Sequence, residues 1–243
     1  MSNIKDITII GGGITGLATA YLAAKGGHKV RILEASPKLG GLLNTFEIQG
    51  SRLEFYYHHF FTHDAELNWL IRELGIDDKL IFRETSMGVL RNGKIFNFNT
   101  PVDLLKFSPI GLFDKLRFGF SSLYLGKVAN WKDFENVPAI KWLYKWAGKG
   151  TTKSLWEPLL NIKFGPFADV VPLSWMVGRL RQRMNSRKGG DERLGYLEGS
   201  LQVLLDALVA QLTEMGVEFH TQSPVQSVEI ENDKLVAVQT PSQ

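Results

Sequence analysis

The sequence predicts an α/β protein that opens with a β-α-β unit of a parallel sheet and carries a largely helical insertion. Three observations support this fold class. Residues 6–34 contain a short apolar segment, an alanine- and leucine-rich helical segment and a second β-prone segment. Residues 101–187 are rich in Trp, Phe, Leu and Lys at helical spacings, and residues 201–238 return to one helix followed by strands. A chain of 243 residues is long enough to bury a sizeable core.

The first elements follow from apolar runs bounded by glycine. Residues 6–10 form a short apolar run, as expected for a strand of a parallel sheet that is covered on both faces. Residues 14–25 predict a helix, and the pair Gly26-Gly27 ends it. Residues 29–34 are β-prone through Val30, Ile32 and Leu33, so a second strand should follow the helix directly.

The later elements are predicted from spacing and turn residues. Asp64 is expected to cap a helix that Gly75 ends, and Asn92-Gly93 indicates a hairpin between two short strands. A leucine stripe predicts a helix over residues 201–215. Further strands are expected over residues 43–48, 217–220, 225–230 and 235–238.

This order of elements divides the chain into three segments. Residues 1–100 should form the first part of one domain, residues 101–193 a helical insertion, and residues 194–243 the return of the chain to the first domain. An aromatic stretch at residues 52–60 is interpreted as a strand that leads into the helix capped by Asp64.

A glycine motif joins the first strand to the first helix. Gly11, Gly13 and Gly16 satisfy the pattern G-x-G-x-x-G in the position that a dinucleotide-binding, Rossmann-like unit requires. The first glycine permits a tight turn, the second lets the backbone approach a pyrophosphate, and the third allows close packing of helix on strand. The N–H groups of the first helical turn, which contains Ile14 and Thr15, would face the phosphates.

The residue after the second strand indicates which dinucleotide is bound. Glu34 lies 18 residues beyond Gly16, where an acidic side chain accepts hydrogen bonds from the ribose 2′-hydroxyl. Its negative charge would repel a 2′-phosphate. The pattern therefore favours FAD or NAD over NADP.

A second glycine pair distinguishes FAD from NAD as the expected cofactor. The segment from Glu34 through Ala35 to Gly40-Gly41-Leu42 resembles the two-glycine motif of the FAD-dependent amine oxidase superfamily, most closely its protoporphyrinogen oxidase and phytoene desaturase branch. The resemblance implies that FAD is the cofactor. It also implies that the backbone of this segment lies close to the ribityl chain and pyrophosphate.

The resemblance extends to residues 52–60, 195–200 and 225–230, and so reaches both ends of the chain. In the last segment it implies that the backbone of the first valine meets the adenine. The cofactor-binding residues that motif and resemblance together predict are Gly11, Gly13, Ile14, Thr15, Gly16, Glu34, Ala35, Gly40, Gly41, Leu42 and Val225.

Three departures from the family pattern are visible. Leu42 stands where many members have a cofactor-contacting arginine, and Ser200 replaces the second glycine of a later pair. Members also continue into a C-terminal glycine-acid segment that holds the flavin, which has no counterpart in these 243 residues. We therefore expect the chain to correspond to the N-terminal portion of such a protein.

The catalytic residues are not assigned by any motif. The resemblance places His58 or His59 near the flavin, where an imidazole donates a hydrogen bond or accepts a proton. The alternative is that both are polar residues covering an aromatic strand. No metal site is expected at these histidines, because no carboxylate or cysteine completes a ligand set.

Composition excludes several chemistries. The chain has no cysteine, which excludes disulfides, a thiolate nucleophile, Cys-ligated zinc and iron–sulfur clusters. No G-x-S-x-G motif supports a hydrolase. Residues 7–24 are uncharged over nearly the length of a membrane span, but four glycines argue against one long helix. We expect a cytoplasmic protein, with peripheral membrane contact as an alternative.

Charge is distributed unevenly. Residues 100–190 carry 15 basic and 6 acidic side chains, net +9, whereas residues 191–243 carry net −7. The basic block is interpreted as a solvated helical surface. Its aromatic residues, interleaved with lysines, offer a peripheral membrane contact within residues 101–190 as the alternative. No nucleic-acid-binding module is recognisable, and the pattern assigns no oligomeric state.

These observations predict an FAD-dependent oxidoreductase that transfers hydride from a small organic substrate to the flavin. Two alternatives stay open. One is a flavin enzyme without net redox chemistry, similar to UDP-galactopyranose mutase, whose diphosphate substrate the basic block would suit. The other is a non-catalytic, truncated FAD-binding fragment.

Overall fold

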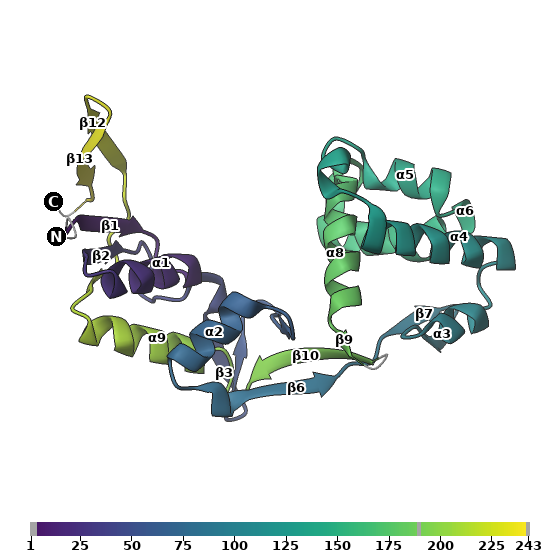
Figure 1. Cartoon of the computed structure of the whole chain (residues 1–243), viewed down its shortest axis with the longest axis horizontal. Helices are drawn as coiled ribbons and strands as arrows, with labels where there is room; N and C mark the ends of the chain where they lie inside the picture. Colours follow the sequence, from purple (N-terminus) through teal and green to yellow (C-terminus); the bar gives the residue numbers. More distant parts are fainter. Residues whose placement is uncertain (1–3, 189–190, 242–243) are drawn as a thin grey trace. The chain divides into compact units, whose positions relative to one another are not determined.

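The computed structural model describes residues 4–188 and 191–241. Contacts between Cα atoms divide the chain into two compact units (Figure 1). Unit 1 contains residues 1–60, 64–82 and 195–243, and unit 2 contains residues 61–63 and 83–194.

Unit 1 is the α/β part of the chain. Its helices and strands are β1 (Asp6–Ile10), α1 (Ile14–Lys25), β2 (Lys29–Leu33), β3 (Thr45–Ile48), β4 (Ser51–Glu54), α2 (Ala65–Glu73), α9 (Gln202–Glu214), β11 (Glu218–His220), β12 (Ser227–Glu231) and β13 (Lys234–Gln239). Strands β6 (Leu80–Glu84) and β10 (Asp191–Leu197) continue from this unit into unit 2, and together with β5 (Phe60–Phe61) they form a sheet in the order β5-β10-β6.

A parallel sheet positions the N-terminal motif. Strand β2 lies between β1 and β11 and runs parallel to both, with Asp6 opposite Lys29 and Glu218 opposite Arg31. Parallel strands need a crossover, and α1 supplies it between β1 and β2. The prediction of an α/β fold with a β-α-β start is therefore confirmed, and the bounds of β1 and α1 agree with those expected from the sequence.

The core of unit 1 forms where α1 and α9 cover the sheet. Leu17 of α1 is fully buried, as are Ile32 of β2 and Leu208 of α9. Each such side chain contributes about 1.5–3 kcal/mol relative to an exposed one. The leucine stripe predicted for residues 201–215 is the buried face of α9, consisting of Leu204, Leu205, Leu208 and Leu212, with Leu201 at its N-cap.

Unit 2 is mainly helical. It contains β7 (Gly88–Arg91), β8 (Lys94–Asn97), α3 (Pro101–Lys106), α4 (Leu112–Leu123), α5 (Ala139–Trp146), α6 (Lys149–Thr151), α7 (Glu157–Phe164), α8 (Leu173–Asn185) and β9 (Arg187–Lys188). Short 3-10 and π turns join these helices at Tyr124–Val128, Trp131–Phe134, Thr152–Trp156 and Gly165–Val170. Strands β7 and β8 form the hairpin that Asn92-Gly93 predicted.

The second core of the chain is formed by this helical bundle. Leu143 of α5, Leu160 of α7 and Leu173 of α8 are buried side by side with Met176 and Leu125. Proline and glycine residues interrupt the pattern between the helices, which explains why no helix of unit 2 is longer than thirteen residues in the described part of the chain.

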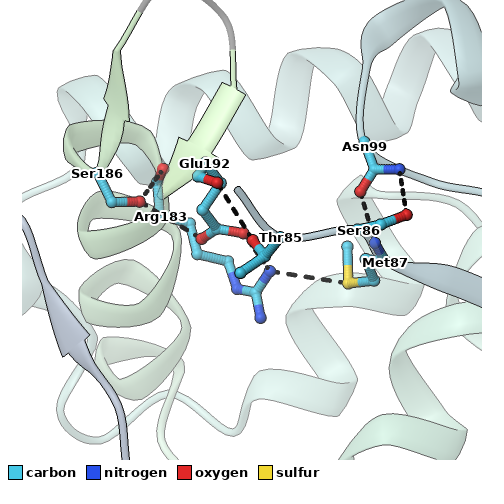
Figure 2. Close-up of polar contacts among 7 residues, drawn as sticks. All are labelled: Thr85, Ser86, Met87, Asn99, Arg183, Ser186 and Glu192. Atoms are coloured by element: carbon cyan, nitrogen blue, oxygen red, sulfur yellow. Dashed lines mark hydrogen bonds and ion pairs between the residues drawn. The ribbon is translucent and has the colours of Figure 1, made fainter. Parts of the chain in front are cut away.

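A polar network in unit 2 joins β10, the end of α8 and the segment before β7 (Figure 2). The backbone carbonyl of Glu192 accepts a hydrogen bond from the N–H of Thr85 at 3.0 Å. Its carboxylate pairs with Arg183 at 3.2 Å. Asn99 Oδ1 accepts from the N–H of Met87 at 2.6 Å. Arg183 is thus committed to an ion pair that holds the ends of these elements together.

Two glycines allow α4 to dock on α6. The N–H of Gly150 donates to Asp114 Oδ2 at 3.1 Å. A Cβ atom on Gly150 would lie 2.1 Å from this oxygen, and one on Gly148, whose φ is +97°, would lie 2.2 Å from Asp114 Oδ1. A side chain at either position would displace the aspartate that the backbone binds.

We predict that Gly150→Ala lowers the free energy of unfolding by about 1–3 kcal/mol, because the methyl group expels the Asp114 carboxylate. Gly119→Ala is the matched control. Gly119 lies on α4, and a Cβ added there would meet no atom within 4 Å. The variant should therefore leave the free energy of unfolding unchanged or raise it by about 0.5–1 kcal/mol.

Urea unfolding followed by circular dichroism measures both changes. In an Asp114→Ala background, the cost of Gly150→Ala should largely disappear. An equal cost in both backgrounds would contradict the steric explanation.

Candidate functional site

Three backbone segments meet where the parallel strands β1 and β2 end. The N–H of Gly11, directly after β1, donates to the carbonyl of Leu33 at the end of β2, at 2.8 Å. The N–H of Gly40 donates to the carbonyl of Gly12, also at 2.8 Å. Gly13 and Gly40 form an isolated parallel bridge. The two glycine motifs of the sequence are therefore neighbours in space, at the strand ends where parallel α/β sheets bind ligands.

Close backbone contacts explain why these positions are glycine. A Cβ on Gly16 would lie 2.0 Å from the carbonyl oxygen of Gly11, which has φ +100°. A Cβ on Gly41, with φ +55°, would lie 3.1 Å from the Cα of Gly13. Gly40 has φ +117°, a conformation that costs an L residue about 1–3 kcal/mol.

The N-terminus of α1 faces this junction without a side-chain cap. Gly13 is the N-cap residue and has no side chain with which to accept the first N–H groups, and no acidic residue lies in the first turn. The N–H groups of Ile14, Thr15 and Gly16 have no intrahelical acceptor. Together with the positive end of the helix dipole they provide the donors that an anionic group requires.

Glu34 is fixed by backbone N–H groups on both sides. Its Oε2 accepts from Gly12 N at 2.6 Å, and its Oε1 accepts from Ser36 N at 2.8 Å. Burial by itself raises the pKa of Glu34, but the hydrogen bonds from Ser36 and Gly12 outweigh it, so the pKa lies below the ordinary value of 4.5. The side chain is therefore ionised at neutral pH. Each carboxylate oxygen keeps a lone pair for a further donor.

The remaining predicted residues surround this centre less closely. Ala35 and Leu42 are exposed, Leu42 to 64%. Val225 lies in an extended link just after Ser223, whose N–H donates to the carbonyl of Glu34 at 2.9 Å. The strand expected to begin at Val225 begins at Ser227 instead, where pairing with β13 starts.

The two candidate histidines lie between β4 and β5. His58 Nδ1 is 2.6 Å from the carbonyl of Tyr56, and the rings of His59 and Tyr57 are 5.0 Å apart. The single aromatic strand expected over residues 52–60 is wrong for residues 55–59, which lie between β4, ending at Glu54, and β5, beginning at Phe60. The physical reason is that pairing with β3 ends at Thr45, opposite Glu54, and only one further hydrogen bond, from the N–H of Phe55 to the carbonyl of Asn44 at 3.0 Å, follows it.

A partly buried contact in unit 1 was not predicted from the sequence. Both carboxylate oxygens of Glu54 lie 2.7 Å from the hydroxyl of Tyr196, and Oε1 also accepts from the N–H of Leu201 at 2.7 Å. Burial, the hydrogen bond and the charge of Glu54 raise the pKa of Tyr196. The contact ties β4 to the N-terminus of α9. The only indication of this contact in the sequence was that residues 52–60 and 195–200 both resemble the amine oxidase superfamily.

The adjoining turn explains one departure from the family pattern. Ser200, which replaces a glycine, has φ +81° and follows Gly199, with φ +93°. Its hydroxyl accepts from the N–H of Gln202 at 3.2 Å, at the start of α9. The serine thus occupies a conformation that favours glycine, and it contributes a hydrogen bond there.

Residues 4–188 and 191–241 contain neither a metal cluster nor a membrane-spanning helix. No group of three or more His, Cys, Asp or Glu side chains in this part of the chain is arranged to hold a metal ion. None of its helices combines the length and apolar character that crossing a bilayer demands.

A glycine turn, an uncapped helix and an acid at the next strand end define an α/β dinucleotide-binding protein. The chain matches the model of the family described as flavin containing amine oxidoreductase over residues 14–243. It belongs to this family, and the family implies the FAD cofactor that the sequence predicts.

Individual relatives agree with this assignment. The chain is 25% identical over 238 residues to a zeta-carotene desaturase of Zea mays, covering 88% of this chain and 41% of the relative. It is 52% identical over 44 residues, 18% of this chain and 9% of the relative, to an L-amino-acid oxidase of Echis ocellatus. The structure of an oxidoreductase from Methanosarcina mazei matches 99% of this chain and 56% of its own chain, with a TM-score of 0.72 and 19% identity. The chain thus spans about half the length of its relatives.

We predict that Glu34 stabilises the fold in a pH-dependent way. Because its folded-state pKa is lowered, the contribution is fully present above the unfolded pKa and is lost as the pH falls through the folded value. Glu34→Gln should reduce the free energy of unfolding by about 1 kcal/mol at pH 7. The difference from wild type should shrink as the pH falls below 4.5 and through the folded-state value.

Denaturant unfolding of both proteins between pH 7 and pH 2.5 measures this difference. Glu66→Gln is the matched control, because Glu66 is an exposed carboxylate of α2 in the same unit. The free energy of unfolding of this variant should fall with pH as it does in the wild type. A Glu34→Gln difference that does not change with pH would contradict the prediction.

Proposed function

We propose that this chain forms the FAD-binding part of a flavin-dependent oxidoreductase that removes hydride from a small organic substrate. The observation that carries the proposal is the junction of the two glycine turns with the uncapped N-terminus of α1 and the ionised Glu34. It combines donors for a pyrophosphate with an acceptor for a ribose hydroxyl in a cradle that side chains would fill.

In this proposal each predicted residue has one role. The first turn of α1 holds the pyrophosphate, Glu34 accepts from the adenosine ribose, and the glycine pair follows the ribityl chain. The exposed Leu42 offers a hydrophobic contact directly after the glycine pair. The full set is Gly11, Gly13, Ile14, Thr15, Gly16, Glu34, Ala35, Gly40, Gly41, Leu42 and Val225.

When bound, FAD supplies the acceptor for two electrons and a proton, and this chain orients it. Backbone N–H donors in the first turn of α1 would bind the phosphate oxygens. The charge of Glu34 discriminates against a 2′-phosphate. His58 and His59 are our candidates for holding or accepting a proton beside the substrate, because imidazole is the side chain that exchanges protons near neutral pH.

The names of the relatives favour oxidation over the alternative without net redox chemistry. Both a desaturase and an oxidase are oxidoreductases, and each matches this chain in sequence. We therefore infer a small organic molecule as the substrate, oxidised at a C–H or C–N–H position.

We predict that Gly16→Ala abolishes cofactor binding and that Glu34→Gln weakens it about tenfold, the cost of losing one charged hydrogen bond. The reason for the first is the 2.0 Å approach of the added Cβ to the carbonyl of Gly11. Titration with FAD, followed by flavin fluorescence, and with ADP, followed by calorimetry, measures both affinities. ADP carries the diphosphate and the adenosine ribose but no flavin, so it reports on the first turn of α1 and on Glu34 without the flavin contacts.

Gly119→Ala and Glu66→Gln are the matched controls and should bind like wild type. A folded wild-type chain that binds neither FAD nor ADP would overturn the proposal. If the chain binds ADP but not FAD, its contacts to the flavin ring are too weak to hold the cofactor.

We also propose a peripheral membrane contact through unit 2. Helix α4 exposes apolar side chains, with Phe113 72% and Phe120 71% exposed, and Lys115 and Arg117 lie on the same helix. An apolar face flanked by basic residues favours the surface of an anionic bilayer. The apolar set is Leu112, Phe113, Leu116, Phe120 and Leu123.

We predict that the wild-type chain sediments with vesicles of phosphatidylcholine and phosphatidylglycerol and that Phe113→Ser/Phe120→Ser lowers the bound fraction at least about fivefold. Ile162→Ser/Phe167→Ser, which changes two equally exposed apolar residues of unit 2, is the matched control. No sedimentation of the wild type, or an equal loss in both variants, would contradict this contact.

A further inference from the structure

Unit 2 contains a cavity of about 520 Å³ that no step of the proposed flavin chemistry uses. Residues of α8 form most of its wall, and His63 and Trp131, the latter from the turn Trp131–Phe134, form the rest. A volume of this size falls within the range of small-molecule sites in proteins.

The cavity is positively charged. Arg179 and Arg181 both line it, and no Asp or Glu is among the described residues around it. Within the described part of the chain, no carboxylate oxygen lies within 4.0 Å of either guanidinium. The next arginine of the helix, Arg183, is paired with Glu192 (Figure 2). Of these three arginines, Arg183 therefore stabilises the fold, and Arg179 and Arg181 line the cavity.

The two arginines are held in place with most of their donors unused. Arg179 donates to Gln182 Oε1 at 3.3 Å, and its guanidinium lies 5.7 Å from the centre of the Trp175 ring. Arg181 donates to the carbonyl of Ala129. A guanidinium has five N–H donors, so each of the two keeps several for a ligand besides the one that bonds to Gln182 or Ala129. Such preorganised forks match the two oxygens of a carboxylate.

The rest of the wall is aromatic and amide-bearing. Trp131 and Trp175 line the cavity, and the side-chain amides of Gln182 and Asn185 lie beside the arginines. Indole faces pack well against a flat ring, and amide N–H groups add donors for an oxyanion. A cation would meet two positive charges here, and an uncharged hydrocarbon would give no acceptor to the remaining N–H donors of the two guanidinium groups.

We propose that this cavity is a binding site for a small molecule that carries an aromatic ring and a carboxylate. The carboxylate lies against Arg179 and Arg181, and the ring lies against Trp131 and Trp175. The site belongs to unit 2 alone, so it stands whether or not unit 1 binds FAD.

Isothermal titration of the full chain with 2-naphthoate tests the site, with 2-naphthamide as the uncharged probe of the same shape. We expect one molar equivalent of naphthoate to bind, and the amide to bind at least about tenfold more weakly. Affinity should fall as salt is raised, because the partners are charged. Equal affinity for the two probes, or no binding of naphthoate, would overturn the proposal.

Variants locate the site. Arg179→Gln changes an exposed side chain and should weaken naphthoate binding about tenfold, and Asn185→Asp, which adds a negative charge at an exposed position, should do the same. Asn185→Asp should also improve binding of 2-naphthylmethylamine, a change that simple loss of structure would not produce.

Arg91→Gln is the matched control, because Arg91 is an arginine of unit 2 on β7 outside the cavity. It should bind naphthoate like wild type. A loss of affinity equal to that of Arg179→Gln would show that net charge, rather than this cavity, attracts the probe.

Discussion

Gly41 approaches Gly13 so closely that a Cβ on Gly41 would lie 3.1 Å from the Cα of Gly13, and the arrangement of unit 1 at its candidate site depends on this approach. The bridge from Gly13 to Gly40 brings the turn after β1 against the turn after β2, and the Gly16–Gly11 contact sets α1 close to its strand. Glu34 then bonds across the same junction to Gly12. Backbone N–H groups, rather than basic side chains, therefore provide the positive potential of the site.

Acidic side chains bound by backbone N–H groups recur as the joints of this protein. Glu34 joins two turns, Glu54 joins β4 to α9, and Asp114 joins α4 to α6. In each case the carboxylate accepts from a main-chain donor that would otherwise be without a partner, which makes the contact costly to lose. These contacts fix where the ends of helices and strands lie. Helix propensity and a leucine stripe do not specify those positions.

The sequence predicted the elements whose ends are marked by special residues. The bounds of β1 and α1 and the hairpin at Asn92-Gly93 agree with expectation, because glycine or asparagine marks the turn in each. It failed for residues 55–59, which are aromatic and suited to a strand but have no partner strand there. Strand formation depends on pairing, which the sequence of one segment does not contain. The glycine motifs indicated the candidate site, yet not that Glu54 would hold Tyr196.

The sequence by itself indicated the dinucleotide-binding unit, since a turn without room for side chains requires glycine, and this motif is followed by an acid at the end of the next strand. The tertiary structure decided which role each of several identical residues has. Arg179, Arg181 and Arg183 are all arginines of α8, but the packing of this helix leaves the first two beside a cavity and pairs the third with Glu192. The reason is physical: spacing along a helix gives the direction of each side chain, whereas the neighbour it meets is brought there by distant parts of the chain.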